Sequence, residues 1–249
     1  MTQTGNYGAR RGSLHMVLVG ATGLIGTEVM KRTADHPEIR LTAISRREVP
    51  LPDGARMEMI LADPASWGEV IGQLSPDVLV SALGTTWRKA GQSQEAFHAV
   101  DHDLVVACAT AASEARVPQF IGVSSAAADR FSKNFYLRTK GEMEQSVKKL
   151  AFARVDMLRP GLLRGKRGND RRTKERLAIM ASPLTDLFMG GSLKQYRSIP
   201  AGLVADAIYA LTEARADGRY VHDNEAIRGV LLRANAKRHL ASGRLDAGD

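Results

Sequence analysis

The sequence has 249 residues, enough for one domain with a substantial core, and its 44% hydrophobic and 25% charged residues are ordinary for a soluble globular protein. A single cysteine, Cys108, excludes a disulfide framework within the chain, and no apolar run reaches the roughly 18 residues of a membrane span. The net charge of +8 is compatible with nucleic acid, a membrane surface or an anionic ligand as partner.

Both ends of the chain have polar sequences. Residues 1–15 have no apolar segment of the kind found in signal peptides, and we expect a disordered leader there. Residues 234–249 are predicted to form a frayed, flexible tail. The folded domain is therefore expected to span residues 16–233, and a reducing cytoplasmic location is the default expectation.

A glycine-rich turn follows the first predicted strand, an apolar run at residues 16–19, and precedes an amphipathic helix predicted at 25–34. Gly20 can make the sharp turn, Gly23 lets a phosphate approach the backbone, and Gly26 lets the helix pack closely on the strand. The helix N-terminus then offers unpaired N–H groups to a pyrophosphate. The spacing is G-x-x-G-x-x-G rather than G-x-G-x-x-G, so an ordinary strand-to-helix turn is the alternative to a dinucleotide site.

Short apolar runs and amphipathic segments alternate along the rest of the chain. Further strands are predicted at residues 41–45, 57–62, 77–83, 120–124, 155–158 and 219–222. Further helices are predicted at residues 67–74, 94–116, 134–150, 173–188 and 200–214. This alternation predicts an α/β fold, a doubly wound parallel sheet of the Rossmann type, with a small C-terminal region on the substrate side. Ligands of such sheets bind at the carboxyl ends of the strands.

Two arginines, Arg46 and Arg47, follow the second predicted strand, where NAD-binding proteins usually carry an acidic residue. A guanidinium group there pairs with a 2′-phosphate, so the two residues predict that NADP(H) is preferred over NAD(H). A pair of surface arginines is the alternative. Asp63, after the third predicted strand, could contact the adenine edge or cap the helix behind Pro64, and the sequence does not decide between these roles.

Tyr136 and Lys140 lie four residues apart on one face of a predicted helix, after a predicted strand that ends near Ser124 and Ser125. A phenol is a weak acid at neutral pH, and a nearby ammonium group favours the phenolate. A serine hydroxyl can hydrogen-bond a substrate carbonyl. These four residues are predicted to be catalytic, and a surface tyrosine and lysine on an amphipathic helix are the alternative.

Two polar clusters have plainer interpretations. His98 and His102 are four residues apart with Asp101 and Asp103 nearby, a set that could in principle bind zinc. The residues between the histidines differ from those of a zinc-protease motif and no third ligand is apparent, so we predict no metal site. The second cluster is a basic stretch at 164–176, which lacks aromatic stacking residues; it favours a solvated segment or an anionic small-molecule substrate over nucleic acid.

Several motifs resemble the short-chain dehydrogenase/reductase superfamily, among them GATGLIG at 20–26, the serine pair and the tyrosine–lysine pair. Three further stretches are similar to the atypical branch of that superfamily around the HIV Tat-interactive protein. They are LGTTWRKAG at 83–91, NFYLRTKGEME at 134–144 and RPGLL at 159–163. The resemblance covers about residues 16–226 and implies a nicotinamide cofactor and oxidoreductase chemistry.

The resemblance also implies a role for individual residues. It places beside the pyrophosphate Gly20, Thr22, Gly23, Leu24 and Ile25, and beside the 2′-phosphate Arg46 and Arg47. It places on the nicotinamide side Leu83, Gly84, Pro160, Gly161 and Leu162, with Lys140 also holding the ribose. Tyr136 and Lys140 match the catalytic pair, and either Ser124 or Ser125 matches the serine. The fourth strand ends in Ala-Leu-Gly rather than the usual Asn-Ala-Gly, so no asparagine proton-relay partner is identified.

The expected function is hydride transfer between NADP(H) and a carbonyl or alcohol substrate, with Tyr136 as proton donor. The alternative is a non-catalytic, NADPH-responsive regulatory protein, because some members of this branch are discussed as regulators. The sequence does not identify the substrate. A homodimer formed through the long helices is one expected arrangement, and the sequence does not decide the oligomeric state.

Overall fold

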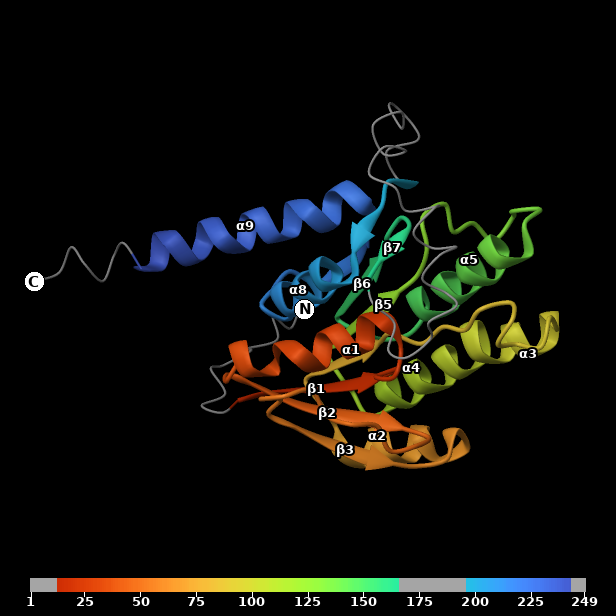
Figure 1. Ribbon diagram of the computed structural model, residues 1–249, viewed down its shortest axis with the longest axis horizontal. Coiled ribbons are helices and arrows are strands. Elements are labelled where there is room, and N and C mark those ends of the chain that lie inside the picture. Colours follow the sequence, from red (N-terminus) through yellow and green to blue (C-terminus); the bar gives the residue numbers. More distant parts are fainter. Residues whose placement is uncertain (1–12, 166–195, 243–249) are drawn as a thin grey trace, which may run out of the picture.

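A seven-stranded parallel sheet forms the centre of the fold, with strands in the order β3-β2-β1-β4-β5-β6-β9 (Figure 1). The computed structural model describes residues 13–165 and 196–242. The strands are β1 (Leu14–Val19), β2 (Ile39–Ser45), β3 (Met57–Leu61), β4 (Val78–Ser81), β5 (Gln119–Val123), β6 (Arg154–Leu158) and β9 (Gly218–His222). Strand order reverses between β1 and β4, and such a reversal opens a crevice at the carboxyl ends of the two strands.

Helices cover both faces of this sheet. Their bounds are α1 (Leu24–Lys31), α2 (Trp67–Leu74), α3 (Gln94–His98), α4 (Leu104–Glu114), α5 (Phe135–Lys148), α8 (Ala201–Thr212) and α9 (Asn224–Ser242). Short 3₁₀ turns η1 (Arg32–Asp35) and η2 (Pro64–Ser66) and a π-helical turn η3 (Ala99–Asp103) join some of them. A separate two-residue parallel pair is formed by β7 (Leu163–Arg164) and β8 (Ile199–Pro200).

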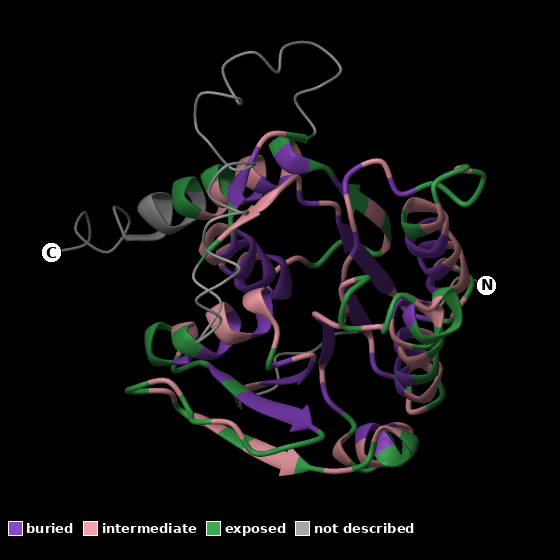
Figure 2. Ribbon diagram, turned by 45° about the vertical axis from the view of Figure 1, so that its right-hand side comes forward, coloured by how far each residue is buried: buried purple, intermediate pink, exposed green. Residues whose placement is uncertain are grey.

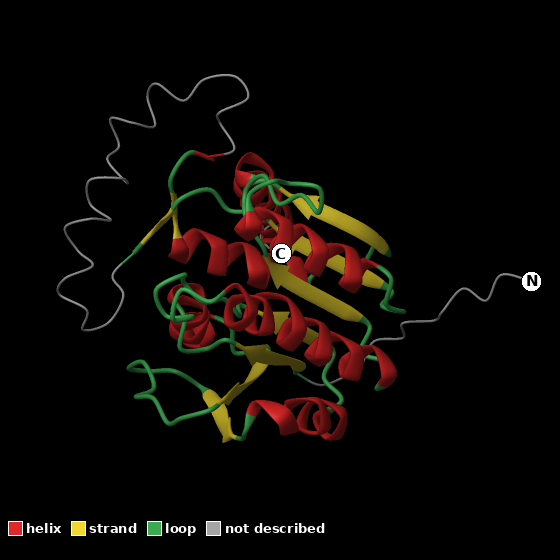
Figure 3. Ribbon diagram, turned by 90° about the vertical axis from the view of Figure 1, so that its right-hand side faces the viewer, coloured by secondary structure: helices red, strands yellow, loops and turns green. Residues whose placement is uncertain are grey.

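The core has two halves because alternate residues of each strand point to opposite faces. Met16 and Leu18 of β1 pack in the half with α1, α8 and α9, while Val17 and Val19 pack in the half with α2, α4 and α5. All four side chains are fully buried, as expected for a central strand covered on both faces (Figure 2). The predicted doubly wound α/β fold is confirmed, and Figure 3 shows the sheet with its helices from the side that carries the carboxyl ends of β1 and β2.

The helix predicted at 94–116 is a composite of α3, η3 and α4. Its middle turn is π-helical, with hydrogen bonds that span five residues instead of four. Sequence periodicity assumes 3.6 residues per turn, so it cannot reveal a local change of this kind. Both candidate sites below depend on this turn.

The chain ends differ in part from the prediction. Strand β1 starts at Leu14, inside the predicted leader, because the backbone N–H of His15 donates to Asp77 and its Nε2 lies 3.0 Å from Thr42 Oγ1. Helix α9 continues to Ser242, so residues 234–242 of the predicted frayed tail are helical. The remaining leader, the helix predicted at 173–188 and most of the basic stretch lie outside the described residues.

Candidate cofactor and active site

The turn after β1 requires two of its glycines. Gly20 has a φ of +87°, and a Cβ there would lie 2.4 Å from the carbonyl carbon of Ala82 at the end of β4. A Cβ on Gly26 would lie 2.2 Å from the carbonyl oxygen of Gly20. No side chain fits at either distance, so β1, β4 and α1 meet as closely as the predicted dinucleotide turn demands.

The N-terminus of α1 is open to an anion. Its N-cap, Gly23, has no side chain to bond the first-turn N–H groups, and the first turn carries no acidic residue. Thr27 Oγ1 turns inward and donates to the carbonyl oxygen of Gly23 at 2.8 Å. Free N–H groups and the helix dipole together suit a pyrophosphate, so the residues present fit the cofactor that the sequence predicts.

Three predicted pyrophosphate residues differ in what they offer. Thr22 is exposed at the turn, whereas Ile25 is 5% exposed and belongs to the core, so only its backbone could face a ligand. Leu24 is half-buried, and a Cβ on Gly165 would lie 2.8 Å from its Cδ1. Gly165, directly after β7, therefore packs against the start of α1.

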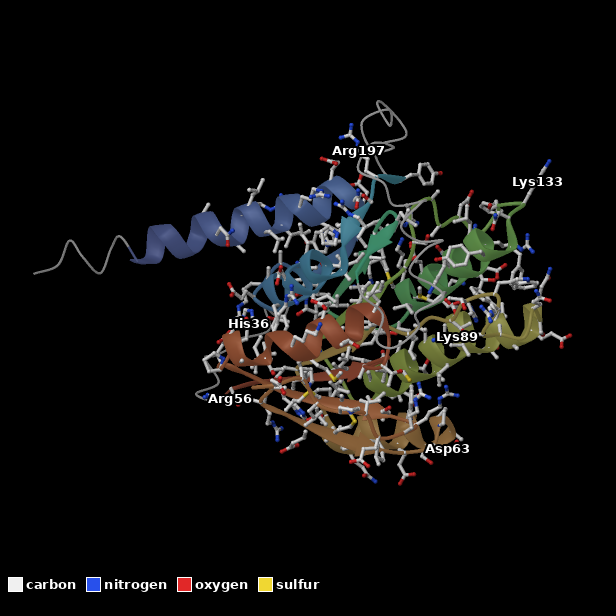
Figure 4. All side chains as sticks on the ribbon, viewed as in Figure 1. His36, Arg56, Asp63, Lys89, Lys133 and Arg197 are labelled. Atoms are coloured by element: carbon white, nitrogen blue, oxygen red, sulfur yellow. The ribbon has the colours of Figure 1, made fainter. Side chains whose placement is uncertain are left out.

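The ribose end of the expected site lies beyond β2 and β3. Arg46 and Arg47 are exposed, and the turn that carries them is held by Ser45, whose Oγ donates to the carbonyl oxygen of Arg47 at 2.8 Å. Asp63 lies near α2 (Figure 4) and accepts from the Ala65 N–H at 2.9 Å. Asp63 is therefore the cap of η2, one of its two predicted roles, and its contact with adenine stays a prediction.

The predicted catalytic pair lies at the start of α5, which Asn134 caps by accepting from the Leu137 N–H at 3.2 Å. The Tyr136 side chain is 41% exposed, and its ring centroid lies 5.6 Å from that of Phe97. Lys140, one turn further, is 3% exposed. The tyrosine is thus accessible from solvent, whereas the lysine is buried inside the protein.

Asp101 holds Lys140 in place, with Oδ1 2.7 Å from the lysine Nζ. Asp101 is 1% exposed, and its Oδ2 accepts from the Thr85 N–H at 2.7 Å. The ion pair is short, yet Oδ1 has no hydrogen bond of ordinary angular geometry within the described residues. A Cβ on Gly84 would lie 3.5 Å from Asp101 Oδ1 and 3.9 Å from Lys140 Nζ, so the pair adjoins the loop after β4.

Sequence reasoning considered Asp101 only as a neighbour of the histidines and missed its contact with Lys140. The sequence nevertheless contains a pattern that indicates a buried partner for Asp101. Phe97, Val105 and Cys108 form an apolar stripe at helical spacing, and Asp101 falls within it. All four residues are buried, and a charged residue in an apolar stripe needs a charged partner.

The two serines lie just beyond β5 and differ in access. Ser124 is 6% exposed, and its Oγ has no hydrogen-bond partner among the described residues. Ser125 is half-buried, and its Oγ donates to the carbonyl oxygen of Ala126 at 3.3 Å. Ser125 is therefore the more accessible of the two serines, and the Oγ of Ser124 is buried.

The loop after β6 closes this end of the sheet. The carbonyl oxygen of Pro160 accepts from the Ala126 N–H at 3.0 Å, which ties the loop to the serine segment. The N–H of Gly161 donates to the buried side chain of Asn224 at 3.4 Å, and the carbonyl oxygen of Leu162 accepts from the Ile199 N–H at 2.9 Å. Three hydrogen bonds therefore fix the segment that is predicted to flank the nicotinamide.

Cys108 has no part in this chemistry. Burial raises the pKa of its thiol to about 12, so the nucleophilic thiolate does not form at neutral pH. The residues that the structure brings together come from the ends of β1, β4, β5 and β6 and from α5, which all meet at one edge of the sheet. This edge is where nucleotides bind in doubly wound folds.

Known proteins with related sequences match most of this region. A family model described as NAD(P)H-binding matches residues 20–214. The protein FMP52 of Meyerozyma guilliermondii is 36% identical over 62% of this chain and 67% of its own length. FMP52 of Saccharomyces cerevisiae is 36% identical over 63% of this chain and 69% of its own length.

Solved structures share the fold at low sequence identity. MoeE5, in complex with UDP-glucuronic acid and NAD, is 16% identical, with a TM-score of 0.63 over 84% of this chain and 75% of MoeE5. The dTDP-4-dehydrorhamnose reductase of Bacillus anthracis, in complex with NADP, is 15% identical, with a TM-score of 0.61 over 91% of this chain and 83% of the reductase. These likenesses support the Rossmann-type architecture.

The expected cytoplasmic location is wrong by the same comparison, because both FMP52 relatives are named mitochondrial proteins. The expectation depended on one cysteine and on a missing secretion signal, and neither distinguishes the cytoplasm from the mitochondrion. No helix within residues 13–165 and 196–242 is long and apolar enough to cross a membrane. Given its glycine turn, its strand order and the match over residues 20–214, the chain belongs to the NAD(P)H-binding family.

Proposed function

We propose that the protein is an NADP(H)-dependent reductase of the atypical short-chain dehydrogenase/reductase branch, acting on a carbonyl or alcohol substrate. One observation carries this proposal: Lys140 lies one turn from the accessible Tyr136 and is buried against Asp101 beside the loop after β4. A surface tyrosine and lysine, the alternative considered above, would not need a buried carboxylate. A buried ion pair costs desolvation energy, so Lys140 differs from a solvated lysine on the outer face of an amphipathic helix.

The cofactor would lie along the carboxyl edge of the sheet. The open N-terminus of α1 would receive its pyrophosphate, and the exposed Arg46 and Arg47 would pair with a 2′-phosphate. The reduced nicotinamide supplies a hydride when it is bound, and the protein supplies binding and orientation. The preference for NADP(H) depends on the two arginines alone.

The protein would supply the proton. Tyr136 would donate its hydroxyl proton to the carbonyl oxygen while the carbonyl carbon gains the hydride, so that a ketone or aldehyde becomes an alcohol. The Lys140 ammonium stabilises the phenolate left behind, and Asp101 fixes the position of that ammonium. Ser125 would orient the carbonyl oxygen, because its side chain is the more accessible of the two serines.

Calorimetric titration with NADPH and then NADH tests the cofactor assignment. NADPH should bind at least about tenfold more tightly, a difference of about 1.4 kcal/mol. The variants Arg46→Ala and Arg47→Ala should remove most of this preference and leave NADH binding unchanged. Tighter binding of NADH would overturn the arginine assignment, and binding of neither cofactor would overturn the proposed function.

A screen of carbonyl substrates then tests catalysis. Tyr136→Phe should lower turnover by about 10² to 10⁴-fold while NADPH binding is retained. Tyr220→Phe is a matched control, because Tyr220 lies on the edge strand β9 and its hydroxyl donates to the carbonyl oxygen of Asp217. If Tyr136→Phe behaves like this control in activity and in cellular output, the protein is an NADPH-responsive regulator instead. An anionic substrate and a homodimer also stay predictions.

A further inference from the structure

Two histidines and an aspartate meet on the outer face of the π-helical turn η3. The Nδ1 of His98 lies 3.2 Å from Asp103 Oδ1, and the Nδ1 of His102 lies 2.8 Å from the same oxygen. One ligand atom from each of these residues lies within 4.8 Å of the others. The two imidazole rings lie 4.4 Å apart with an interplanar angle of 30°.

The π-helical turn is what adds Asp103 to this group. In an α-helix a residue five positions further along is rotated by about 140°, so Asp103 would face away from His98. A π-turn closes over five residues and brings positions i, i+4 and i+5 to one face. The third ligand that the sequence did not reveal is therefore created by the local backbone.

The other ring nitrogens of both histidines face helix α5. His98 Nε2 lies 3.7 Å from Glu142 Oε2, and His102 Nε2 lies 3.2 Å from Ser146 Oγ. Metal-binding histidines commonly donate their second ring N–H to a carboxylate or another polar group, which leaves the first nitrogen free to coordinate. Both rings are oriented in this way, with Nδ1 toward the shared point at Asp103.

We propose that His98, His102 and Asp103 form a binding site for a divalent transition metal ion of the zinc class. Two imidazole nitrogens and a carboxylate oxygen are ligands that zinc prefers, and zinc accepts a water molecule as a fourth ligand. In a tetrahedral zinc site neighbouring ligand atoms are about 3.4 Å apart, and the observed distances of 2.8 and 3.2 Å from Asp103 Oδ1 to the two Nδ1 atoms are close to this value.

The surroundings suit an exchangeable ion. The His98 and His102 side chains are 34% and 18% exposed, so an ion could reach them from solvent. They line an open hollow together with Arg130, Glu142, Gln145 and Ser146. A bound ion would link the end of α3 to η3, and the site does not depend on the proposed reductase activity.

Titration of the protein, without a polyhistidine tag, with Zn²⁺ tests this site, and Co²⁺ gives a spectroscopic readout of tetrahedral coordination. We expect one equivalent to bind, and binding to weaken by at least about a hundredfold in His98→Gln and in His102→Gln. Ser146→Ala should weaken binding by about tenfold, because it removes a partner of the second ring nitrogen. His36→Gln is the matched control. His36 lies on the opposite side of the molecule from Lys89, which precedes α3, and from Lys133, which precedes α5, so it is remote from the proposed site (Figure 4).

The variants change partly exposed side chains, and unchanged melting temperatures should show that they fold. Zn²⁺ should also raise the melting temperature of the native protein and of His36→Gln, but not that of His102→Gln. Absence of saturable binding, or equal binding by His102→Gln and the native protein, would overturn the proposal. The three residues would then form a hydrogen-bonded surface cluster only.

Discussion

Lys140 and Arg154 are both buried cations paired with a buried aspartate, yet the two pairs are built differently. Lys140 contacts Asp101 at a single oxygen, and that oxygen lacks a hydrogen bond of ordinary geometry within the described residues. Arg154 donates a hydrogen bond to each oxygen of Asp156, and both N–O distances are 2.7 Å. Gln119 at 3.0 Å and His222 at 2.8 Å complete the shell around Asp156.

The choice of cation explains the difference. A guanidinium group does not lose its proton in a protein, so Arg154 is a permanent charge that must be fully satisfied. Burial of Asp156 would raise its pKa, but hydrogen bonds from His222, Arg154 and Gln119 outweigh burial and lower the pKa. A lysine has a flexible four-carbon stem and can shift toward a ligand. The incompletely satisfied pair lies at the candidate active site, whereas the saturated pair lies on β6 and is joined to β9 through His222.

The largest effect is expected when the saturated pair is broken. Asp156→Asn leaves a guanidinium buried without a counter-charge and should lower the free energy of unfolding by about 3 to 5 kcal/mol. Chemical denaturation measures this loss. Asp53→Asn, in an exposed loop, is the matched control and should change stability by less than about 0.5 kcal/mol. Cofactor affinity of the folded fraction should be unchanged in both variants.

Acid should produce part of the same loss without a mutation. The pKa of Asp156 is lower in the folded protein than its ordinary value of 3.8, so the unfolded chain binds the proton more tightly. The stabilising contribution is therefore complete above about pH 5 and is lost as the pH falls through the folded pKa. The stability difference between the native protein and Asp156→Asn should shrink in that range. A difference that stays constant down to pH 2 would contradict this assignment.

Breaking the pair at the site should cost less stability. In Asp101→Asn the amide oxygen can still accept from the Thr85 N–H, and the flexible stem of Lys140 allows its ammonium group to move. We expect a loss of about 1 to 3 kcal/mol in the free energy of unfolding, the usual cost of an imperfectly satisfied buried group. On the proposed function, turnover should fall while NADPH binding is largely retained.

Stability and turnover should be measured on Asp156→Asn as well. This variant should show the opposite pattern, with a large loss of stability and unchanged turnover per folded molecule. If Asp101→Asn destabilises the protein as much as Asp156→Asn, the distinction between an incompletely satisfied and a saturated ion pair is wrong for this fold. If its turnover is unchanged, Asp101 only fills a structural position.

The predictability of the fold follows from the same physics. Alternating periods of 2.0 and 3.6 residues and the glycine turn predicted the sheet because they report local geometry. Residues 67–74 form α2 as predicted. Contacts between residues that are distant in sequence produce no periodic pattern. The contact between Asp101 and Lys140 was therefore not predicted, although both residues were considered separately.

The π-helical turn η3 is the second feature that the sequence did not predict. A pattern that assumes 3.6 residues per turn places Asp103 away from His98, whereas the structure brings both to one face. The role of Asp63 was left open for a different reason. Its sequence position suits a helix cap and a nucleotide contact equally well, and only the 2.9 Å hydrogen bond from Ala65 assigns the cap.

Asp63 extends the comparison to an exposed carboxylate with a single backbone partner. Asp63→Ala should lower the free energy of unfolding by only about 0.5 to 1 kcal/mol, since it removes one cap hydrogen bond. Asp63→Asn is the control, because asparagine caps as well as aspartate and should retain full stability. NADPH affinity should change less than about twofold in either variant if the cap is the whole role. A tenfold loss of affinity with unchanged stability would instead assign Asp63 to the adenine edge. The loss of this carboxylate would then weaken cofactor binding, whereas the loss of a buried carboxylate lowers the free energy of unfolding.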